Sequence, residues 1–370
     1  MKICLIEPFF TGSHKTWAEG YQQHSQHDVD ILSLPGKHWK WRMHGAAITL
    51  AKQFLETDKT YDFILATDLL DLTTFLALTR RKTKDTPVGI YFHENQLTYP
   101  WSPTDPDVKL KRDNHYAFIQ YGSALAADQV YFNSIYHKDS FLNALPKFLK
   151  QFPDFKTLDQ LAALENKSQV LHLGLDLSFF DNHKVDRRDG PPVLLWNHRW
   201  EYDKNPKAFF NALSKLKKEQ IEFRLIVLGE SYKKSPDVFK TIQQTFDKEL
   251  LHFGYATDRA DYARLLWQSD ILPVTSIQDF FGGSIVEAIY TGCIPLLPNR
   301  LAYPEHLPQV TKSEYLYEGV DDFYTNLKQV ILNFESNSST DNLRQLVKRY
   351  NWCNLAPQYD AAFSELLNPL

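Results

Sequence analysis

The stretch from Thr275 to Pro298, TSIQDFFGGSIVEAIYTGCIPLLP, holds residues whose types and spacing suggest chemistry. Two carboxylates, Asp279 and Glu287, flank the pair Gly282 and Gly283. The pattern predicts a strand end, a glycine turn, a short helix and a return strand. Glycines before a helix start let backbone N–H groups converge on an anion, and the helix dipole adds to that attraction. We therefore expect a phosphate-binding turn, with Asp279 on the loop beside a sugar and Glu287 inside the helix beside a ribose.

Two cations, Arg199 and Lys204, follow the predicted buried strand Val193–Asn197. Together with the N–H donors of the glycine turn, two cations can neutralise a diphosphate leaving group without a metal ion. The chain has only three cysteines, widely spaced, which argues against a zinc site or a disulfide framework and favours a reducing compartment. The sequence thus predicts a metal-independent diphosphate site, while a merely solvated Arg–Lys pair is the simpler alternative.

Polar residues also follow two predicted strands of the first half: Gly12, Ser13 and His14 after Ile3–Ile6, and His93, Glu94, Asn95 and Gln96 after Val88–Phe92. In α/β folds, ligands bind at the carboxyl ends of parallel strands. We expect both loops to face a ligand. A plain connecting turn and a structural histidine remain the alternatives.

Basic and aromatic residues alternate in the segment PGKHWKWRMHGAA, residues 35–47, which contains Lys37, Trp39, Lys40, Trp41 and Arg42. Such a mixture suits a surface that stacks bases and holds phosphates. A solvated loop anchored by buried tryptophans is equally compatible with it. A second basic cluster contains Lys109, Lys111 and Arg112.

The chain of 370 residues is long enough for two domains, and predicted strands and helices alternate throughout both halves. We expect an N-terminal domain over residues 1–189, a second over 190–345 and a C-terminal crossover helix over 346–370. The net charge of −4 gives no general attraction to nucleic acid, so RNA binding would need a local basic patch. No segment approaches the roughly 20 apolar residues of a membrane span, so we expect a cytoplasmic protein without membrane insertion.

The order of these motifs resembles the retaining glycosyltransferases of the GT-B fold. Within them, the segments KICLIEPFFTGSHKTWAEG, LPGKHWKWRMHGAA, YFHENQLTYP and WNHRWEYDKNP look like the tRNA-queuosine mannosyltransferases. The resemblance implies an α/β protein with two Rossmann-like domains facing a cleft and a C-terminal helix that crosses back. It also implies GDP-mannose as donor, queuosine in the anticodon loop of an aspartate tRNA as acceptor, and no cofactor.

The resemblance also implies roles for individual residues. The expected catalytic residues are His93, Asp279, Arg199 and Lys204. The expected donor-binding residues are Gly12, Arg199, Lys204, Tyr255, Gly282, Gly283, Ser284, Ile285 and Glu287. The expected acceptor-binding residues are Ser13, His14, Lys37, Trp39, Lys40, Trp41, Arg42, Asn95 and Gln96. Asp279 stands where this family usually has a glutamate, one methylene longer.

Two other functions stay open on the sequence. A GT-B enzyme could use another nucleotide sugar and a lipid-linked or small-glycan acceptor, which an exposed apolar patch on the first domain would favour. A flat basic surface around Lys37, Lys40, Arg42, Lys109 and Arg112 would instead favour RNA. A non-catalytic nucleotide-binding or RNA-binding module is the third possibility.

Overall fold

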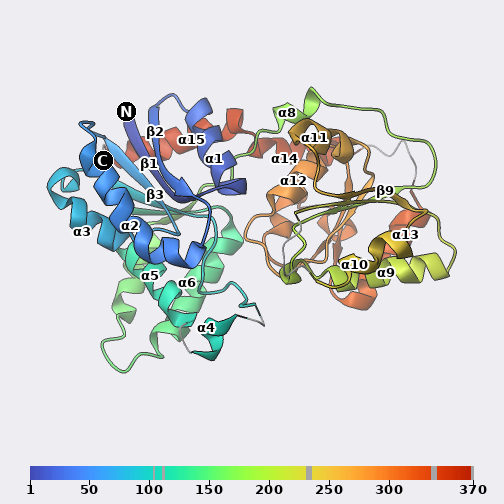
Figure 1. The fold of residues 1–370 in the computed structure, drawn as a ribbon, viewed down its shortest axis with the longest axis horizontal. Helices are drawn as coiled ribbons and strands as arrows, with labels where there is room; N and C mark the ends of the chain where they lie inside the picture. Colours follow the sequence, from blue (N-terminus) through green and yellow to red (C-terminus); the bar gives the residue numbers. More distant parts are fainter. Residues whose placement is uncertain (103–104, 111–112, 231–235, 335–339, 368–370) are drawn as a thin grey trace. The chain divides into compact units, whose positions relative to one another are not determined.

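The computed structural model describes residues 1–102, 105–110, 113–230, 236–334 and 340–367. The chain forms two compact units (Figure 1). Unit 1 combines Met1–Leu175 with Trp352–Leu370, and unit 2 is the continuous segment Asp176–Asn351. Unit 1 is therefore built from two pieces of chain that are far apart in the sequence.

Unit 1 is built on a parallel sheet of six strands among its described residues, in the order β2-β1-β3-β4-β5-β6. The strands are β1 (Lys2–Phe10), β2 (Asp28–Pro35), β3 (Phe63–Thr67), β4 (Val88–Phe92), β5 (Gln129–Phe132) and β6 (Ser168–Val170). The central strands β3 and β4 are buried along their whole length, as their unbroken apolar sequences require. Because neighbouring strands pair in parallel, the loops after β1, β3 and β4 leave the sheet at the same edge.

Helices of unit 1 connect these strands and cover the sheet (Figure 1). They are α1 (Gly12–His24), α2 (Trp39–Glu56), α3 (Leu72–Thr83), α4 (Pro106–Lys109), α5 (Asp113–Ala126), α6 (Ile135–Leu149), α7 (Leu161–Asn166) and α15 (Trp352–Glu365). Helix α1 buries Trp17, Ala18 and Tyr21, at the three- and four-residue spacing of one helical face. Tyr21 donates a 2.8 Å hydrogen bond to Asp360 of α15, which ties the end of the chain to its beginning.

Unit 2 repeats this architecture with the strand order β12-β11-β10-β7-β8-β9. Its strands are β7 (Val193–Asn197), β8 (Arg224–Leu228), β9 (Leu250–Gly254), β10 (Ile271–Pro273), β11 (Ile294–Pro298) and β12 (Leu316–Tyr317). Its α-helices are α8 (Ser178–Asp181), α9 (Pro206–Lys218), α10 (Phe239–Thr245), α11 (Arg259–Trp267), α12 (Gly283–Tyr290), α13 (Val320–Leu332) and α14 (Asp341–Val347). Proline suits the first position of α9, because a residue there donates no hydrogen bond within the helix and the N–H that proline lacks is not missed.

The boundaries of the two units differ from those expected. The expected boundary at residue 189 lies at 175/176, because α8 packs on unit 2: Trp267 donates a 2.8 Å hydrogen bond to the carbonyl of Phe180. A polar, proline-containing segment lies near Asp189, and such a composition is as typical of a surface loop as of a domain linker. The crossover helix starts at Trp352, not at 346, because residues up to Asn351 stay with unit 2.

Two further elements differ from the sequence expectation. The apolar run at residues 170–176, VLHLGLD, is typical of one strand but contributes only Val170 to β6. The basic, aromatic segment expected as a connecting stretch is largely the first part of helix α2, which begins at Trp39. The basic and aromatic residues of this segment lack the regular spacing of apolar residues that marks an amphipathic helix, so the sequence did not show that α2 begins at Trp39.

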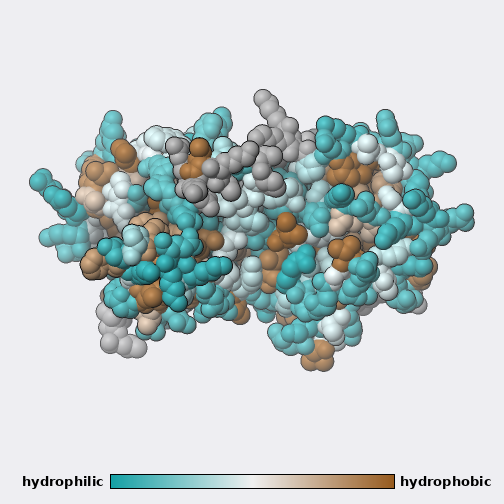
Figure 2. All heavy atoms as spheres, turned by 90° about the horizontal axis from the view of Figure 1, so that it is seen from below, coloured by the Kyte–Doolittle hydropathy of each residue, from teal (hydrophilic) through white to brown (hydrophobic). Residues whose placement is uncertain are grey.

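Among the described residues, no helix combines the length and the apolar character that crossing a membrane requires. One face of the surface is largely hydrophilic, with separate apolar patches between the polar side chains (Figure 2).

Candidate functional site

Lys204 joins the loops that follow β7 and β10 in unit 2. It closes a short 3-10 turn, Tyr202–Lys204, and is buried to 8% exposure. Its Nζ donates to the carbonyl of Gln278 at 2.8 Å and to Oδ2 of Asp279 at 3.3 Å. The buried carboxylate of Asp203 lies 3.3 Å away on the other side. The structure therefore brings two of the expected catalytic residues, Lys204 and Asp279, into direct contact.

Asp279 is also held by a second side chain. The hydroxyl of Tyr303 donates a 3.2 Å hydrogen bond to the same Oδ2 atom that faces Lys204. Burial and the charge of Asp279 raise the pKa of Tyr303, so the hydroxyl stays a donor. One carboxylate oxygen of Asp279 is thus fixed by Tyr303 and Lys204. Tyr303 was not among the expected site residues, because it lies on a different loop with no motif around it.

Arg199 lies on the loop after β7 with its side chain half exposed. Its Nη2 lies 3.3 Å from Oε2 of Glu201. A solvent-exposed ion pair of this kind is weak, because water screens the attraction. The pair with Glu201 therefore contributes little to holding the guanidinium in place.

The glycine turn before α12 has the strained geometry that the sequence indicated. Gly282 adopts a φ of 87°, in the left-handed region that favours glycine. A Cβ atom there would lie 3.2 Å from both Ile285 and Tyr303. Helix α12 then begins at Gly283, and the first N–H groups of a helix have no partner inside it. Gly283 and Ser284 thus supply the donors of the predicted phosphate-binding turn.

Ile285 has a clear structural role at the start of α12. Its backbone N–H donates to the carbonyl of Gly282 at 2.9 Å, and its side chain is fully buried. The residue closes the first turn of α12 and packs into the core, and its contact with the donor stays a prediction.

Glu287 lies in α12, as predicted, and belongs to a hydrogen-bonded chain that the sequence did not reveal. Asn197, at the end of β7, donates to the hydroxyl of Tyr262 at 2.9 Å, and that hydroxyl donates to Oε2 of Glu287 at 2.7 Å. Burial raises the pKa of the Glu287 carboxyl, while the bond from Tyr262 acts in the opposite sense. Asn197 also donates to the carbonyl of Ser284 at 3.1 Å, which links β7 to the start of α12.

Tyr255 directly follows β9 and is 76% exposed. An exposed aromatic ring at the carboxyl edge of a sheet is available to stack on a planar base. The predicted role beside the nucleobase is compatible with this position and stays a prediction.

Unit 1 presents a cluster of ionisable side chains at the same edge of its own sheet. Glu7 in β1 is completely buried, and its Oε2 lies 3.2 Å from Nδ1 of His14 and 3.9 Å from Nε2 of His93. The rings of the two histidines are 4.2 Å apart. His14 and His93 were both predicted, and the structure places them together. Glu7 was missed, although a lone acid inside the apolar strand ICLIEPFF is the signal that could have found it.

The two histidines carry different charges. Burial lowers the pKa of His14, but the charge of Glu7 and the hydrogen bond to it outweigh burial and raise the pKa to about 9. Burial holds the pKa of His93 well below its usual range, and the charge of His14 adds to this effect. At neutral pH His14 is therefore an imidazolium and His93 is neutral. Nε2 of His93 is buried without a hydrogen-bond partner among the described residues.

The loop after β4 is fixed mainly by internal hydrogen bonds. Asp68, fully buried after β3, accepts a 2.8 Å hydrogen bond from the backbone N–H of His93. Asn95 accepts from the backbone N–H of Thr98 at 2.9 Å. Gln96 donates to Glu94 at 2.8 Å. Asn95 and Gln96 are both buried and help to build the loop, and their expected contact with an acceptor stays a prediction.

Glu7, His14 and His93 each offer one atom that could bind a metal ion, and these atoms lie within 4.8 Å of one another. Ligands that share a tetrahedral Zn²⁺ at about 2.0–2.1 Å are separated by about 3.3 Å. The 3.9 Å between Glu7 and His93 exceeds that separation. We therefore interpret the cluster as a network of charges and hydrogen bonds, and metal independence stays a prediction.

Around Gly12, by contrast, the start of α1 is open. Gly12 has a φ of 50°, and a Cβ atom there would meet nothing within 4 Å. Ser13 is exposed beside it. The side chain of Thr11 does not cap α1, and no acidic residue lies in the first turn. The positive end of this helix is thus unshielded by its own side chains.

Two basic side chains of the basic and aromatic segment are already bound within the protein. Lys40 is bound by two carboxylates, with Nζ 2.7 Å from Asp105 and 2.5 Å from Asp107. Arg42 donates to the carbonyl of Pro35 at 2.9 Å. Lys37 is exposed. Lys111 and Arg112, and the side chain of Lys109, lie outside the described part of the chain.

The two tryptophans of this segment also differ. Trp39 is half-buried and packs against Tyr116, with ring centroids 5.2 Å apart. Trp41 is 62% exposed. Of the two expected stacking residues, only Trp41 has a largely exposed ring. Trp39 anchors the helix to its neighbours, which agrees with the alternative of a segment anchored by buried tryptophans.

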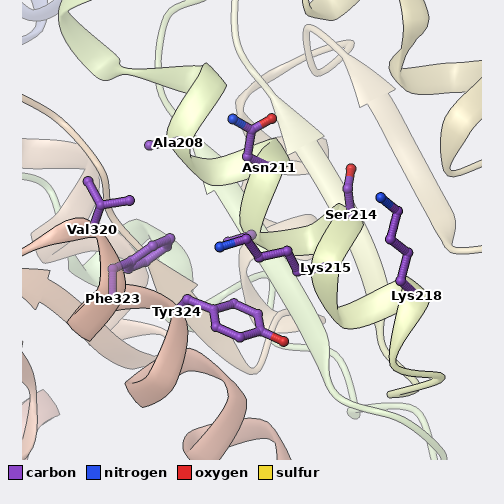
Figure 3. A pocket seen from close by; sticks show the side chains of 9 residues that line it. Ala208, Asn211, Ser214, Lys215, Lys218, Val320, Phe323 and Tyr324 are labelled. Atoms are coloured by element: carbon purple, nitrogen blue, oxygen red, sulfur yellow. The ribbon is translucent and has the colours of Figure 1, made fainter.

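A pocket of about 320 Å³ lies between α9 and α13 in unit 2 (Figure 3). Phe323 and Tyr324 line one side, and Asn211 and Lys215 line the other. Nζ of Lys215 lies 5.1 Å from the centroid of the Tyr324 ring. The pocket contains none of the residues that follow the strands, so it is separate from the candidate site.

Comparison with known proteins accounts for both units. A family model described as the N-terminal part of tRNA-queuosine alpha-mannosyltransferase matches residues 2–175. A model described as glycosyl transferases group 1 matches residues 179–343. A tRNA-queuosine alpha-mannosyltransferase of Drosophila melanogaster is 37% identical over 316 residues, which cover 83% of this chain and 82% of that protein. The chain belongs to the tRNA-queuosine alpha-mannosyltransferase family. The expectation of a glycosyltransferase enzyme is thereby confirmed.

Solved structures agree on the fold. Anabaena HepE in complex with UDP superimposes with a TM-score of 0.67 at 15% identity, over 99% of this chain and all of that chain. Sucrose-phosphate synthase of Thermosynechococcus elongatus gives a TM-score of 0.71 at 12% identity, over 99% of each chain. The expected α/β architecture of the GT-B type, with a parallel sheet in each unit, is confirmed.

Proposed function

We propose that this protein transfers mannose from GDP-mannose to queuosine in the anticodon loop of an aspartate tRNA, with retention of configuration. The observation that carries the proposal is the 37% identity to the Drosophila tRNA-queuosine alpha-mannosyltransferase. The separate match of unit 1 to the N-terminal model of that family supports the same acceptor. The protein acts in the cytoplasm in this proposal, where its free cysteines stay reduced.

Unit 2 holds the donor in this proposal. The N–H groups at the start of α12, with Lys204 and Arg199, bind the diphosphate and stabilise the charge that develops as it leaves. Lys204 is close to Asp279 before the donor binds. When a phosphate takes over Lys204, Asp279 becomes free to accept hydrogen bonds from the sugar. Glu287, oriented by Tyr262, accepts from the ribose hydroxyls.

The chemical step is attack on the same face of the sugar from which the diphosphate departs. The breaking bond joins the anomeric carbon to a phosphate oxygen, and the forming bond joins that carbon to an acceptor hydroxyl oxygen. The departing phosphate oxygen takes the proton of that hydroxyl, so no covalent intermediate with the protein is needed.

The experiment incubates the protein with queuosine-containing tRNA and either GDP-mannose or UDP-sugars, then digests the tRNA and weighs the modified nucleoside. We expect a gain of one hexose with GDP-mannose alone. The matched control is the same tRNA with guanine in place of queuine, which should gain nothing. Release of the hexose by an α-mannosidase, and not by a β-mannosidase, tests retention. Transfer to the control tRNA, or none to the queuosine-containing tRNA, contradicts the proposal.

One observation favours a second acceptor class. The outer face of α2 exposes Trp41, Ile48 and Leu55 at 62%, 60% and 48%, seven residues apart on one helical face. An exposed apolar stripe of this kind suits a lipid-linked acceptor better than RNA. Transfer to a polyprenyl-linked sugar in place of queuosine-containing tRNA would decide for this alternative.

A further inference from the structure

Glu7 is a buried charge that needs a positive partner. Its side chain is fully inaccessible within β1, and one carboxylate oxygen accepts a 2.8 Å hydrogen bond from the N–H of Phe9. A buried carboxylate is unfavourable unless it is paired with a cation. Among the described residues, no lysine or arginine nitrogen lies within 4.0 Å of Glu7, and only His14 and His93 do. A histidine must therefore supply the compensating proton.

His14 is the better partner of the two. Its Nδ1 lies 3.2 Å from Glu7, against 3.9 Å for Nε2 of His93. Two other ionisable groups, Asp68 and Glu94, also raise the pKa of His14. His93, packed against the His14 ring, is neutral. The groups around His14 thus favour its charged form together.

The opposite nitrogen of His14 is the one that can reach a ligand. The side chain keeps 11% of its surface exposed, and Nδ1 is taken by Glu7. Within the described part of the chain, no hydrogen bond to Nε2 of His14 is found. His14 is also the third residue of α1, whose positive end is uncapped by any side chain. Both features attract an anion to the same place.

We propose that Glu7 is a positioning residue that keeps His14 doubly protonated, so that Nε2 of His14 donates a charged hydrogen bond to a phosphate group of the substrate. The proposal rests on the proposed function, because it names a substrate contact of that site. The phosphate belongs either to the nucleotide sugar or to the tRNA backbone. Both present the same chemistry, an anionic phosphate ester oxygen.

The charge state of His14 can be measured without any activity. NMR titration of the imidazole, assigned with a His14→Gln variant, should give a pKa near 9 in the unaltered protein. In Glu7→Gln, which keeps a hydrogen-bonding amide but removes the charge, the pKa of His14 should fall toward or below the ordinary 6.5. A pKa of His14 below about 7 in the unaltered protein overturns the proposal.

Kinetics then test the contact with phosphate. At about pH 8, His14 is charged in the unaltered protein and neutral in the Glu7→Gln variant. We therefore expect the KM of the variant for the phosphate-bearing substrate to be about tenfold higher. About one pH unit below the His14 pKa that the NMR titration gives for Glu7→Gln, both proteins carry the charge, and the difference should largely vanish. A change in KM for GDP-mannose alone assigns the phosphate to the donor, and a change for tRNA alone assigns it to the RNA. A defect of equal size at both pH values is a structural effect and overturns the proposal.

Two further measurements separate the possible failures. Glu19→Gln, an exposed glutamate on the same helix, is the matched control and should change neither quantity. If the unaltered protein transfers no sugar to queuosine, binding of GDP and of tRNA at the two pH values still tests the charge of His14. Absence of any pH-dependent difference between Glu7→Gln and the unaltered protein in both binding assays overturns the proposal independently of the activity.

Discussion

Glu287 shows at the scale of one residue how a partly buried carboxylate is prepared for a ligand. Tyr262 fixes one of its oxygens, which leaves the other available for the ribose hydroxyl that we propose it binds. We expect Glu287→Ala to lower kcat/KM for sugar transfer about 100-fold or more, as does the loss of a preorganised charged group in other enzymes. Glu287→Gln, which keeps an acceptor for Tyr262, should lose activity with little change in thermal stability. Steady-state kinetics and a melting curve measure both.

Glu314→Ala provides the comparison for that substitution. Glu314 is exposed in unit 2, outside α12 and the loops of the site. Near-normal transfer by Glu287→Ala would remove Glu287 from the donor site. An equal loss in both variants would indicate damage to unit 2 as a whole.

Lys204 bears on whether a metal ion is needed. Its ammonium group and the start of α12 lie at the same edge of the unit 2 sheet, so positive charge for a diphosphate is available from the protein. We expect transfer to continue in excess EDTA, within about twofold of the rate with Mg²⁺. Lys204→Ala should instead lower the rate about 100-fold or more under both conditions. Loss of transfer in EDTA with recovery on adding Mg²⁺ would contradict this prediction.

Motifs allowed part of the site to be predicted at this scale. Lys204, Asp279, Gly282 and Glu287 follow predicted strands in a recognisable order, and each lies where that order places it. Tyr262 and Tyr303 could not be predicted, because one lies in helix α11 and the other in a 3-10 turn after β11, and only three-dimensional packing brings them to the site. Glu7 was not predicted, because the residues around it in β1 are apolar and the segment was interpreted only as a buried strand.

Gly282 determines, at the scale of an element, where α12 begins. Its left-handed backbone sets the direction of the first N–H groups, and a side chain would press on Ile285 and Tyr303 at 3.2 Å. We expect Gly282→Ala to lower the free energy of unfolding of unit 2 by about 1–2 kcal/mol. Affinity for GDP should fall as well, because the helix start shifts. Chemical denaturation and GDP titration measure these changes.

Gly122→Ala is a glycine-to-alanine change without such crowding. Gly122 lies inside α5, where a Cβ atom would meet its nearest neighbour at an ordinary 3.8 Å. Alanine there should increase stability by about 0.5–1 kcal/mol. Unchanged GDP affinity in Gly282→Ala would show that the turn does not position the phosphate donors.

Helix α2 contains a basic residue whose tertiary partners could not be recognised from the sequence. The alternation of basic and aromatic residues suggested an RNA-binding surface. Lys40, however, is neutralised by two carboxylates some 65 residues later in the sequence. Such pairing depends on tertiary structure, so composition could not foresee it. The ring of Trp41 is exposed, and its contact with an acceptor stays a prediction.

The whole molecule depends on α15, which returns to unit 1 after the chain has built unit 2. Trp352 is fully buried against Gly20 and Gly174, where a Cβ atom would collide with its indole at 2.0 and 2.5 Å. We expect Trp352→Ala to destabilise unit 1 by about 3–5 kcal/mol, because it leaves a large cavity. Hydrogen exchange resolved along the sequence should show faster exchange in unit 1 than in unit 2.

Trp41→Ala removes a tryptophan from an exposed position and should change stability by no more than about 0.5 kcal/mol. If Trp352→Ala accelerates exchange equally in both units, their stabilities are coupled, and the prediction is wrong.

The overall architecture was the most predictable level. Regular alternation of apolar strands and amphipathic helices indicated two parallel sheets, and both are present. The boundary near Leu175 was not predictable, because a polar, proline-containing segment such as 183–192 marks a surface loop as readily as a domain linker. Only the packing of Phe180 and Trp267 assigns that segment to unit 2.

The split composition of unit 1 has a consequence for synthesis on the ribosome. Tyr21 and Trp17 emerge early, but their partners Asp360 and Tyr359 are translated only after the whole of unit 2. Unit 2, being continuous, can complete its core first, although it comes second in the chain. The apolar face of α1 that packs on α15 therefore stays exposed until the end of the chain has been translated. We expect a chaperone that binds the nascent chain to bind this face.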